Sequence, residues 1–207
     1  MKERGMIFNG EMVRAILDGQ KTQTRRIMKP QPEPCPRGGH WWPSNVFKTM
    51  LHVEDEMQNG KGGWGGLAGD ACPFGDVGDR IWVREAFASG LSTKSTLAYR
   101  ATHKREDLED GFYDTIKWTP SIHMPRWASR ILLEITDVRV ERLNSISDAD
   151  AKAEGCCYGR GGGIPDFAVN PADHFPTLWA SIYGEESWKA NPWVWVIEFK
   201  RVEGGAA

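Results

Sequence analysis

The chain has 207 residues, of which 40% are hydrophobic and 26% are charged, and its formal net charge is −2. A chain of this size can bury a sizeable core, and its slight acidity excludes a protein coated in positive charge for bulk nucleic-acid binding. No apolar run approaches the roughly 18 residues needed to cross a bilayer, and the N-terminal segment lacks the apolar core of a secretion signal, so we expect a cytoplasmic protein with no membrane partner.

The first predicted element is a helix within NGEMVRAILDG, residues 9–19. Its apolar side chains recur at helical spacing and form one stripe, made of Met12, Val13, Ile16 and Leu17. Asn9 can cap the start of this helix, and Gly19 can end it in the left-handed conformation.

Residues 21–27, KTQTRRI, predict an extended segment that leaves this helix. A proline-rich stretch follows, and residues 35–75 are rich in glycine and show no sustained periodicity. We therefore expect residues 35–75 to be an insertion that consists largely of loop or lid.

Three strands are predicted in the middle of the chain. Residues 80–84 alternate apolar and polar side chains behind the turn-forming GDVG, and residues 96–102 predict a second strand. Residues 131–140 predict a longer strand in which the apolar positions change parity near Thr136. A β-bulge or bend is expected at that point.

The C-terminal part predicts two helices and a closing strand. The segment SISDADAKAEG predicts a short helix, with Ser147 as its cap and Gly155 as its end. The second helix, in HFPTLWASIYG, has an apolar stripe of Phe175, Leu178, Trp179 and Ile182. The closing strand directs four side chains to one face, namely Trp193, Trp195, Ile197 and Phe199. Strands with peripheral helices predict a small β-barrel-like α+β domain.

Four blocks of the sequence, in this order, resemble the ASCH family, a branch of the PUA-like β-barrel superfamily associated with RNA. The segment GQKTQTRR matches the family signature G-x-K-x-x-T-x-R with Gly19, Lys21, Thr24 and Arg26. The other blocks are GDRIWVREAF, SDADAKAEG and WVIEFKR, and the longer bacteriophage and prophage members are the most similar. The resemblance implies one PUA-like domain over residues 1–207, a small mixed or antiparallel β-barrel with peripheral helices and a long glycine-rich insertion.

Some compact ASCH proteins are amidohydrolases that remove the acetyl group from N4-acetylcytidine. The lysine, threonine and glutamate proposed to be catalytic in them fall on Lys21, Thr24 and Glu154. The resemblance therefore implies a metal-independent amidohydrolase for acylated cytidine-type nucleosides or modified bases. The Thr24 hydroxyl or a water would attack the amide, and Lys21 would be either a neutral base or a cation that stabilises the oxyanion.

The spacing of these residues constrains their geometry. In a regular strand Lys21 and Thr24 face opposite sides, so they share a pocket only if Lys21 lies in the turn before the strand. Thr24 and Arg26 share a face, which makes Arg26 a candidate clamp for an anion or carbonyl, beside the charge of Arg25. The alternative is a basic edge strand whose charges prevent aggregation. Glu154 lies in the last turn of its helix, where a negative charge is unfavourable, so we expect a role other than helix stability.

A second polar cluster is predicted in SIHMPRWASR, with His123, Arg126, Trp127 and Arg130. Together they suit a stacking platform with phosphate contacts. The alternative is a core tryptophan flanked by exposed arginines. Three further residues are expected to line the same pocket, namely Trp82, Arg84 and Tyr99.

The cysteine and histidine residues do not predict a metal site. The cysteines Cys35, Cys72, Cys156 and Cys157 are too few for a disulfide framework, and with His40 they lack a typical zinc spacing. We therefore expect no metal and no other cofactor, and the oligomeric state stays open.

The alternatives to an amidohydrolase are an RNA-binding module or ribonuclease that uses the same basic cleft, and a non-catalytic phage accessory protein. RNA binding would need the arginines to converge into a basic track, namely Arg25, Arg26, Arg126, Arg130, Arg139 and Arg142.

Overall fold

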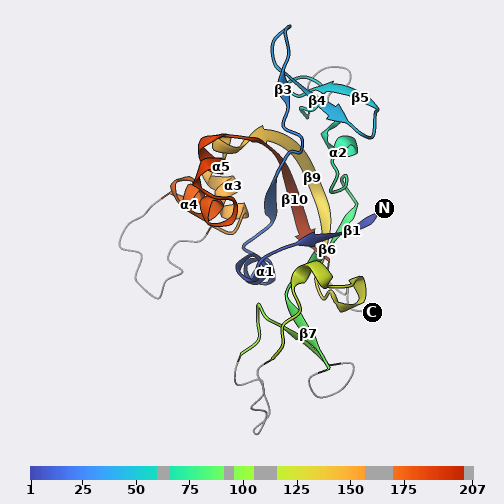
Figure 1. The fold of residues 1–207 in the computed structure, drawn as a ribbon, viewed down its shortest axis with the longest axis vertical. Coiled ribbons are helices and arrows are strands. Elements are labelled where there is room, and N and C mark those ends of the chain that lie inside the picture. The colour runs from blue at the N-terminus through green and yellow to red at the C-terminus, as the bar shows by residue number, and fades with distance from the viewer. Residues whose placement is uncertain (60–65, 91–95, 105–115, 157–169, 203–207) are drawn as a thin grey trace.

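A computed structural model describes residues 1–59, 66–90, 96–104, 116–156 and 170–202 of the chain. The fold is mixed α+β and is built on a five-stranded sheet (Figure 1). In sheet order its strands are β1 (Glu3–Ile7), β6 (Arg80–Arg84), β9 (Leu132–Arg142), β10 (Trp193–Arg201) and β2 (Gln23–Ile27). β1 and β6 are parallel, and the other neighbours are antiparallel. The predicted α+β class is confirmed.

The described residues do not form the closed barrel that we expected. No backbone ladder joins the two edge strands β1 and β2, so the sheet is open. The helix α1 (Gly10–Leu17) connects these two strands. A side chain bridges them, because Arg26 Nη2 of β2 donates to the carbonyl oxygen of Ile7 at 2.8 Å.

Helix α1 begins and ends as the sequence predicts. The Asn9 side chain accepts a hydrogen bond from the backbone N–H of Met12 at 2.8 Å. At the other end Gly19 has φ of 70°, which favours glycine, and the chain turns there towards β2. Val13 and Ile16 are buried in the main core.

The predicted bulge in β9 is confirmed. Glu198 of β10 is opposite Asp137, whereas the next residue, Phe199, is opposite Ile135. Thr136 is therefore an extra residue, and the parity of the apolar side chains changes across it. This change lets both halves of β9 pack into the main core, with Leu133 and Ile135 on one side of the bulge and Val138 and Val140 on the other.

Both faces of β10 are buried from Trp193 to Ile197. The four side chains predicted to share a face, Trp193, Trp195, Ile197 and Phe199, all lie in the main core. Val194 and Val196, on the other face, pack in a second core beneath α3 (Asp148–Ala153), α4 (Pro171–Tyr183) and α5 (Glu185–Lys189). Phe175 and Trp179 of α4 are buried as predicted, but Ile182 is 37% exposed. Tyr183 packs on Trp179 in its place, with 4.3 Å between ring centroids.

The described part of the segment that we expected to be a loop or lid is an ordered wall of the main core. It contains the strands β4 (His40–Ser44) and β5 (Thr49–His52) and the short helix α2 (Ala68–Ala71), and the strand β3 (Glu33–Pro34), just before it, pairs antiparallel with β4. Trp42, Leu51 and Met57 are buried in the main core, and Trp42 meets Trp195 edge-on with 5.4 Å between centroids. The indole ring of Trp42 thus joins this small sheet to β10.

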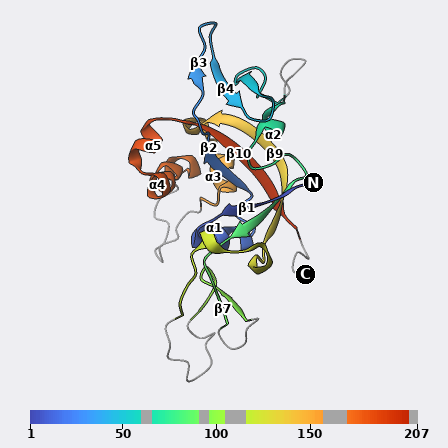
Figure 2. The ribbon, with the colours of Figure 1, turned by 45° about the vertical axis from the view of Figure 1, so that its right-hand side comes forward.

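The hairpin of β7 (Phe87–Ser89) and β8 (Leu97–Tyr99) projects at the end of the molecule opposite β3 and β4 (Figure 2). β8 lies within the strand predicted at 96–102. At the base of the hairpin Phe87 packs with Met124 and Ala128, which belong to a segment with short 3-10 turns at Ser121–His123 and Arg126–Ala128. A further 3-10 turn spans Leu143–Ser145. Within the described ranges, no helix is both long and apolar enough to cross a membrane.

Candidate functional site

Lys21 and Glu154, which are 133 residues apart in the sequence, form a buried ion pair. The ammonium nitrogen of Lys21 lies 2.6 Å from Glu154 Oε2 and also donates to the backbone carbonyl of Glu154 at 2.9 Å. The two residues also form an isolated antiparallel backbone bridge. Lys21 is 2% exposed and Glu154 is 6% exposed. The structure thus brings together two of the three residues predicted to be catalytic.

Two local signals position this pair. On one side, the Gly19 turn brings the N–H of Lys21 within 2.9 Å of the carbonyl oxygen of Ala15, which fixes the chain just before β2. On the other side, α3 starts with a capping box of Ser147 and Asp150 and ends at Glu154. Each of these two features depends on neighbouring residues in the sequence, whereas the contact between Lys21 and Glu154 is a tertiary contact.

Gly155 allows the two segments to approach closely. Its φ of 81° is in the left-handed region that favours glycine, and it ends α3 as predicted. An added Cβ at this position would lie 3.0 Å from the Cβ of Ala15 and 3.2 Å from that of Lys21. A larger residue would therefore push α3 away from Lys21.

The environment of Lys21 lowers the pKa of its amine relative to a lysine in water. Burial is the largest influence and lowers the pKa of Lys21, the contact with Glu154 opposes this effect, and the nearby charges of Arg26 and Arg25 lower the pKa further. The net direction is downward from 10.5. A neutral amine still has two N–H groups, and Lys21 makes two contacts with Glu154, one to Oε2 and one to the backbone carbonyl oxygen. Both protonation states therefore fit the observed contacts.

Arg25 lies on the same side of β2 as Lys21 and shares its partner. Its Nη1 is 3.4 Å from Glu154 Oε1, and its Nη2 is 3.0 Å from Glu141 Oε2 and 3.5 Å from Asp150 Oδ2. The Arg25 side chain is 0% exposed. Glu154 therefore holds two cations, and removal of Lys21 would not leave its carboxylate alone.

The cluster continues to Arg139 of β9. This guanidinium is surrounded by four carboxylates, which belong to Asp137, Glu141, Asp150 and Glu198. The distances are 2.6 Å to Glu141 and 2.7 Å to Asp150. Sequence reasoning missed these acidic partners, although the alternation of Asp137, Arg139 and Glu141 places all three on one strand face.

Thr24 and Arg26 lie on the opposite face of β2. Thr24 pairs with Ile197 of β10, a main-core residue, and cross-strand partners share a face. The guanidinium carbon of Arg26 lies 5.2 Å from the centroid of the Phe8 ring. Lys21 precedes the strand, but its side chain points to the same side as that of Arg25, because both contact Glu154. The turn therefore does not bring Lys21 and Thr24 to one side.

The second predicted cluster is divided into separate contacts. Arg130 makes two hydrogen bonds to the buried carboxylate of Glu85, at 2.9 and 3.1 Å, and lies 4.0 Å from the centroid of the Tyr99 ring. Burial is the largest influence on Tyr99 and raises its pKa. The sequence contained no signal for Glu85, because it stands singly between a strand and an apolar segment.

Trp82 and Arg84 lie on the outer face of β6. The Arg84 guanidinium is 5.4 Å from the Trp82 ring and donates to the backbone oxygens of Ser121 and Ile122. Gly5 of β1 leaves room for the indole, since an added Cβ would lie 2.5 Å from a ring atom of Trp82. This stack of Arg84 on Trp82 is separate from the Lys21–Glu154 pair.

Trp127 is 69% exposed, so it is not the core tryptophan of the alternative prediction. His123 is also exposed, and Ile122 is 60% exposed. Arg126 forms an ion pair with Glu3 at 2.9 Å. Arg126 and Arg130 have carboxylate partners, as Arg139 does, and these carboxylates compensate part of their positive charge.

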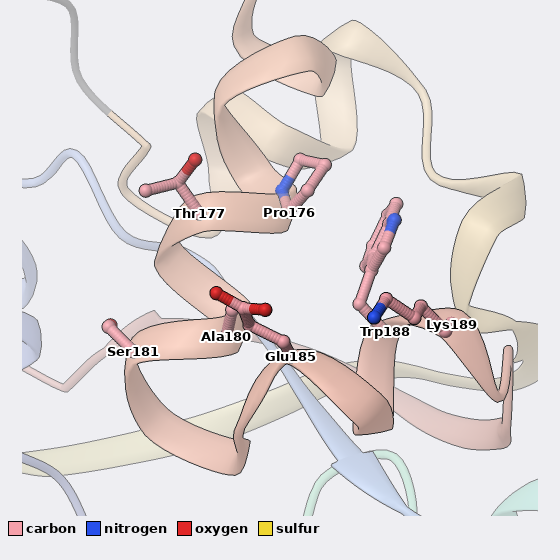
Figure 3. Close-up of a pocket in the computed structure, with 7 residues that line it drawn as sticks. All are labelled: Pro176, Thr177, Ala180, Ser181, Glu185, Trp188 and Lys189. Atoms are coloured by element: carbon pink, nitrogen blue, oxygen red, sulfur yellow. The ribbon is translucent and has the colours of Figure 1, made fainter.

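A groove of about 510 Å³ lies between α4 and α5 (Figure 3). Ala180 and Trp188 contribute apolar surface, and Thr177, Ser181, Glu185 and Lys189 surround them with polar groups. Lys21 and Glu154 do not line this groove. In the described part of the chain, no three His, Cys, Asp or Glu side chains are grouped to hold a metal ion. Cys157 lies outside the described residues.

Comparison of this chain with protein-family models, with curated proteins and with solved structures gives no match.

Proposed function

We propose that this chain is an amidohydrolase that acts on acylated cytidine-type nucleosides or modified bases, with Lys21 and Glu154 at its centre. The observation that carries this proposal is the 2.6 Å contact between Lys21 Nζ and Glu154 Oε2 in a water-excluded environment that lowers the pKa of the lysine. A proton-transfer group works best when its pKa approaches the operating pH. The resemblance to the ASCH family adds support, because its lysine and glutamate fall on these two positions.

In the proposed reaction, neutral Lys21 takes a proton from a water that attacks the amide carbonyl. The ammonium then stabilises the oxyanion and transfers its proton to the leaving amine, which releases a carboxylic acid and the free nucleobase amine. Glu154 is a positioning residue that holds Lys21 and stabilises its charged form. Water is the nucleophile in this proposal because Thr24 lies on the other face of β2.

Substrate access requires a local movement. The pair is almost fully buried, and the N–H of Thr22 donates to the carbonyl oxygen of Ala153 at 2.8 Å beside it. We propose that the end of α3 separates from the start of β2 to admit the acylated base. Only a few hydrogen bonds hold this contact, in contrast to the nine-residue ladder between β10 and β9.

Turnover of N4-acetylcytidine, followed by chromatography, tests this proposal. We expect activity in the native chain and a loss of about 100-fold or more in Lys21→Ala, which is the contribution typical of a proton-transfer group. Glu154→Gln should also lose activity, because Glu154 holds Lys21 and stabilises its charged form. Thr24→Val should retain activity within about threefold, because a water attacks in its place. Lys152→Ala, at an exposed lysine of α3, is the matched control and should be unchanged. No turnover of any acylated cytidine by the native chain would contradict the proposal.

A second candidate function, binding of single-stranded RNA, is favoured by one observation, the 69% exposure of Trp127. A base stacked on an aromatic ring contributes about 1–3 kcal/mol. We therefore expect Trp127→Ala to weaken binding of a short RNA by about 5- to 150-fold, and Trp127→Phe to retain most of the affinity. Fluorescence anisotropy at two salt concentrations measures this effect. Equal affinities of the native chain and Trp127→Ala would exclude this surface.

A further inference from the structure

A small cavity of about 230 Å³ lies at the start of α1, at the end of that helix opposite Lys21. Its walls come from three chain segments, the beginning of α1, the residues after β6 and the residues after β8. It is lined by Gly10, Arg14, Glu85, Ala86, Arg100 and Ala101. None of these residues belongs to the amidohydrolase site proposed above.

Two guanidinium groups line this cavity. Arg14 Nη1 donates to the carbonyl oxygen of Ala101 at 2.9 Å, which fixes the orientation of the fork and leaves its other N–H groups for a ligand. Arg100 is exposed, and no ion pair joins its side chain to another residue of the described ranges. Its backbone is held in place, because its N–H donates to the carbonyl oxygen of Ala86 at 2.9 Å.

The charge of Glu85 in the same cavity is already compensated. Both of its carboxylate oxygens accept hydrogen bonds from Arg130, and the Glu85 side chain is only 2% exposed. Among the residues that the structure describes, the charges of Arg14 and Arg100 are therefore in excess at this site. The positive end of α1 adds a smaller contribution of the same sign.

The size of the cavity limits what it can hold. Pockets for whole drug-sized ligands measure about 300–1,000 Å³, so a cavity of about 230 Å³ suits a small group. Arginine pairs bind phosphate oxygens through parallel N–H groups. We propose that this cavity binds a phosphate group, either as free phosphate or as the phosphate monoester of a nucleotide, between Arg14 and Arg100.

Isothermal titration of the full chain at low ionic strength tests the site, with inorganic phosphate and cytidine 5′-monophosphate as separate probes. We expect saturable binding that weakens at least tenfold in Arg100→Ala and is partly restored in Arg100→Lys. Arg37→Ala is the matched control, because Arg37 is exposed in the turn between β3 and β4, at the other end of the molecule. If cytidine 5′-monophosphate binds more tightly than inorganic phosphate, the ligand of the site is a phosphate monoester. If the two bind equally, the ligand is free phosphate.

A variant at Gly10 tests the location independently. An added Cβ here would lie 3.6 Å from Arg14 Nη1 and 3.8 Å from the Cβ of Ala101, so it makes ordinary contacts at the cavity wall. Gly10→Ala should fold, whereas the longer side chain of Gly10→Gln should enter the cavity and weaken phosphate binding at least tenfold. Absence of binding up to about 10 mM phosphate, roughly tenfold above a millimolar dissociation constant, would overturn the proposal. An equal loss in Arg37→Ala would do the same.

Discussion

Replacement of Glu154 with leucine is expected to lower the free energy of unfolding by about 3–5 kcal/mol, the cost of breaking a buried ion pair from one side. The amine of Lys21 would lose its 2.6 Å contact and keep only the backbone carbonyl of residue 154. Arg25 would lose one of its carboxylate partners in the same step. Urea denaturation of the native chain and the variant measures this difference.

Replacement of Lys21 should lower the free energy of unfolding less than replacement of Glu154. In Lys21→Met the carboxylate of Glu154 keeps Arg25, whose Nη1 is 3.4 Å from its Oε1, and the apolar side chain no longer requires desolvation of an amine. We expect Lys21→Met to cost roughly half as much as Glu154→Leu. Lys152→Met, at an exposed position two residues before Glu154, is the control and should not change stability. A larger cost for Lys21→Met than for Glu154→Leu would show that Arg25 does not share the carboxylate.

The pH dependence of stability should report the protonation of Lys21. Burial lowers the pKa of Lys21 below 10.5, so between the folded-state pKa and 10.5 the unfolded chain binds more protons than the folded chain. The contribution of Lys21 to stability therefore rises with pH across that window. Lys21→Met should lack this rise, and a native chain without it would contradict the lowered pKa.

Replacement of Arg139 with methionine is the second large effect that we expect. It leaves Asp137, Glu141, Asp150 and Glu198 without their common cation and with Arg25 as the remaining nearby one. The Arg139 side chain is 22% exposed, so solvent screens part of the interaction. We expect a cost of about 2–3 kcal/mol near neutral pH, below the full cost of breaking a buried pair.

Acid should reduce the effect of Arg139→Met. Burial acts to raise the pKa of Asp150, but hydrogen bonds from Ser147 and the charges of Arg25 and Arg139 outweigh it and lower the pKa below 3.8. The stability that Asp150 contributes is therefore present above its unfolded-state pKa and is lost as the pH falls below it. Denaturation at pH 7 and at pH 3 measures the change, with Arg37→Met as the exposed control. If Arg139→Met lowered the free energy of unfolding equally at pH 7 and at pH 3, the loss would not arise from the contacts of Arg139 with the carboxylates.

Local signals in the sequence predicted several elements correctly. The ends of α1 are marked by Asn9 and Gly19, and the ends of α3 by Ser147 and Gly155. The parity change at Thr136 is a β-bulge. Each of these features depends on a few neighbouring residues, because caps, glycine turns and strand alternation act over one or two turns of chain. Trp42 had no such signal, since the strand that places it pairs with β3 across a connection that contains Pro36, Gly38 and Gly39, and with β5 on its other side.

The sequence by itself determined α1, α3 and α4 and the strands β2, β6, β8, β9 and β10, and it placed Lys21 at a turn and Glu154 at a helix end. Only the tertiary structure decided that these two side chains meet, that Arg25 joins them and that Thr24 faces the other core. It also left β1 and β2 unpaired where a closed barrel was expected. The physical reason is that capping and alternation are set by adjacent residues, whereas the partner of a buried charge depends on strand register between segments that lie far apart in the chain.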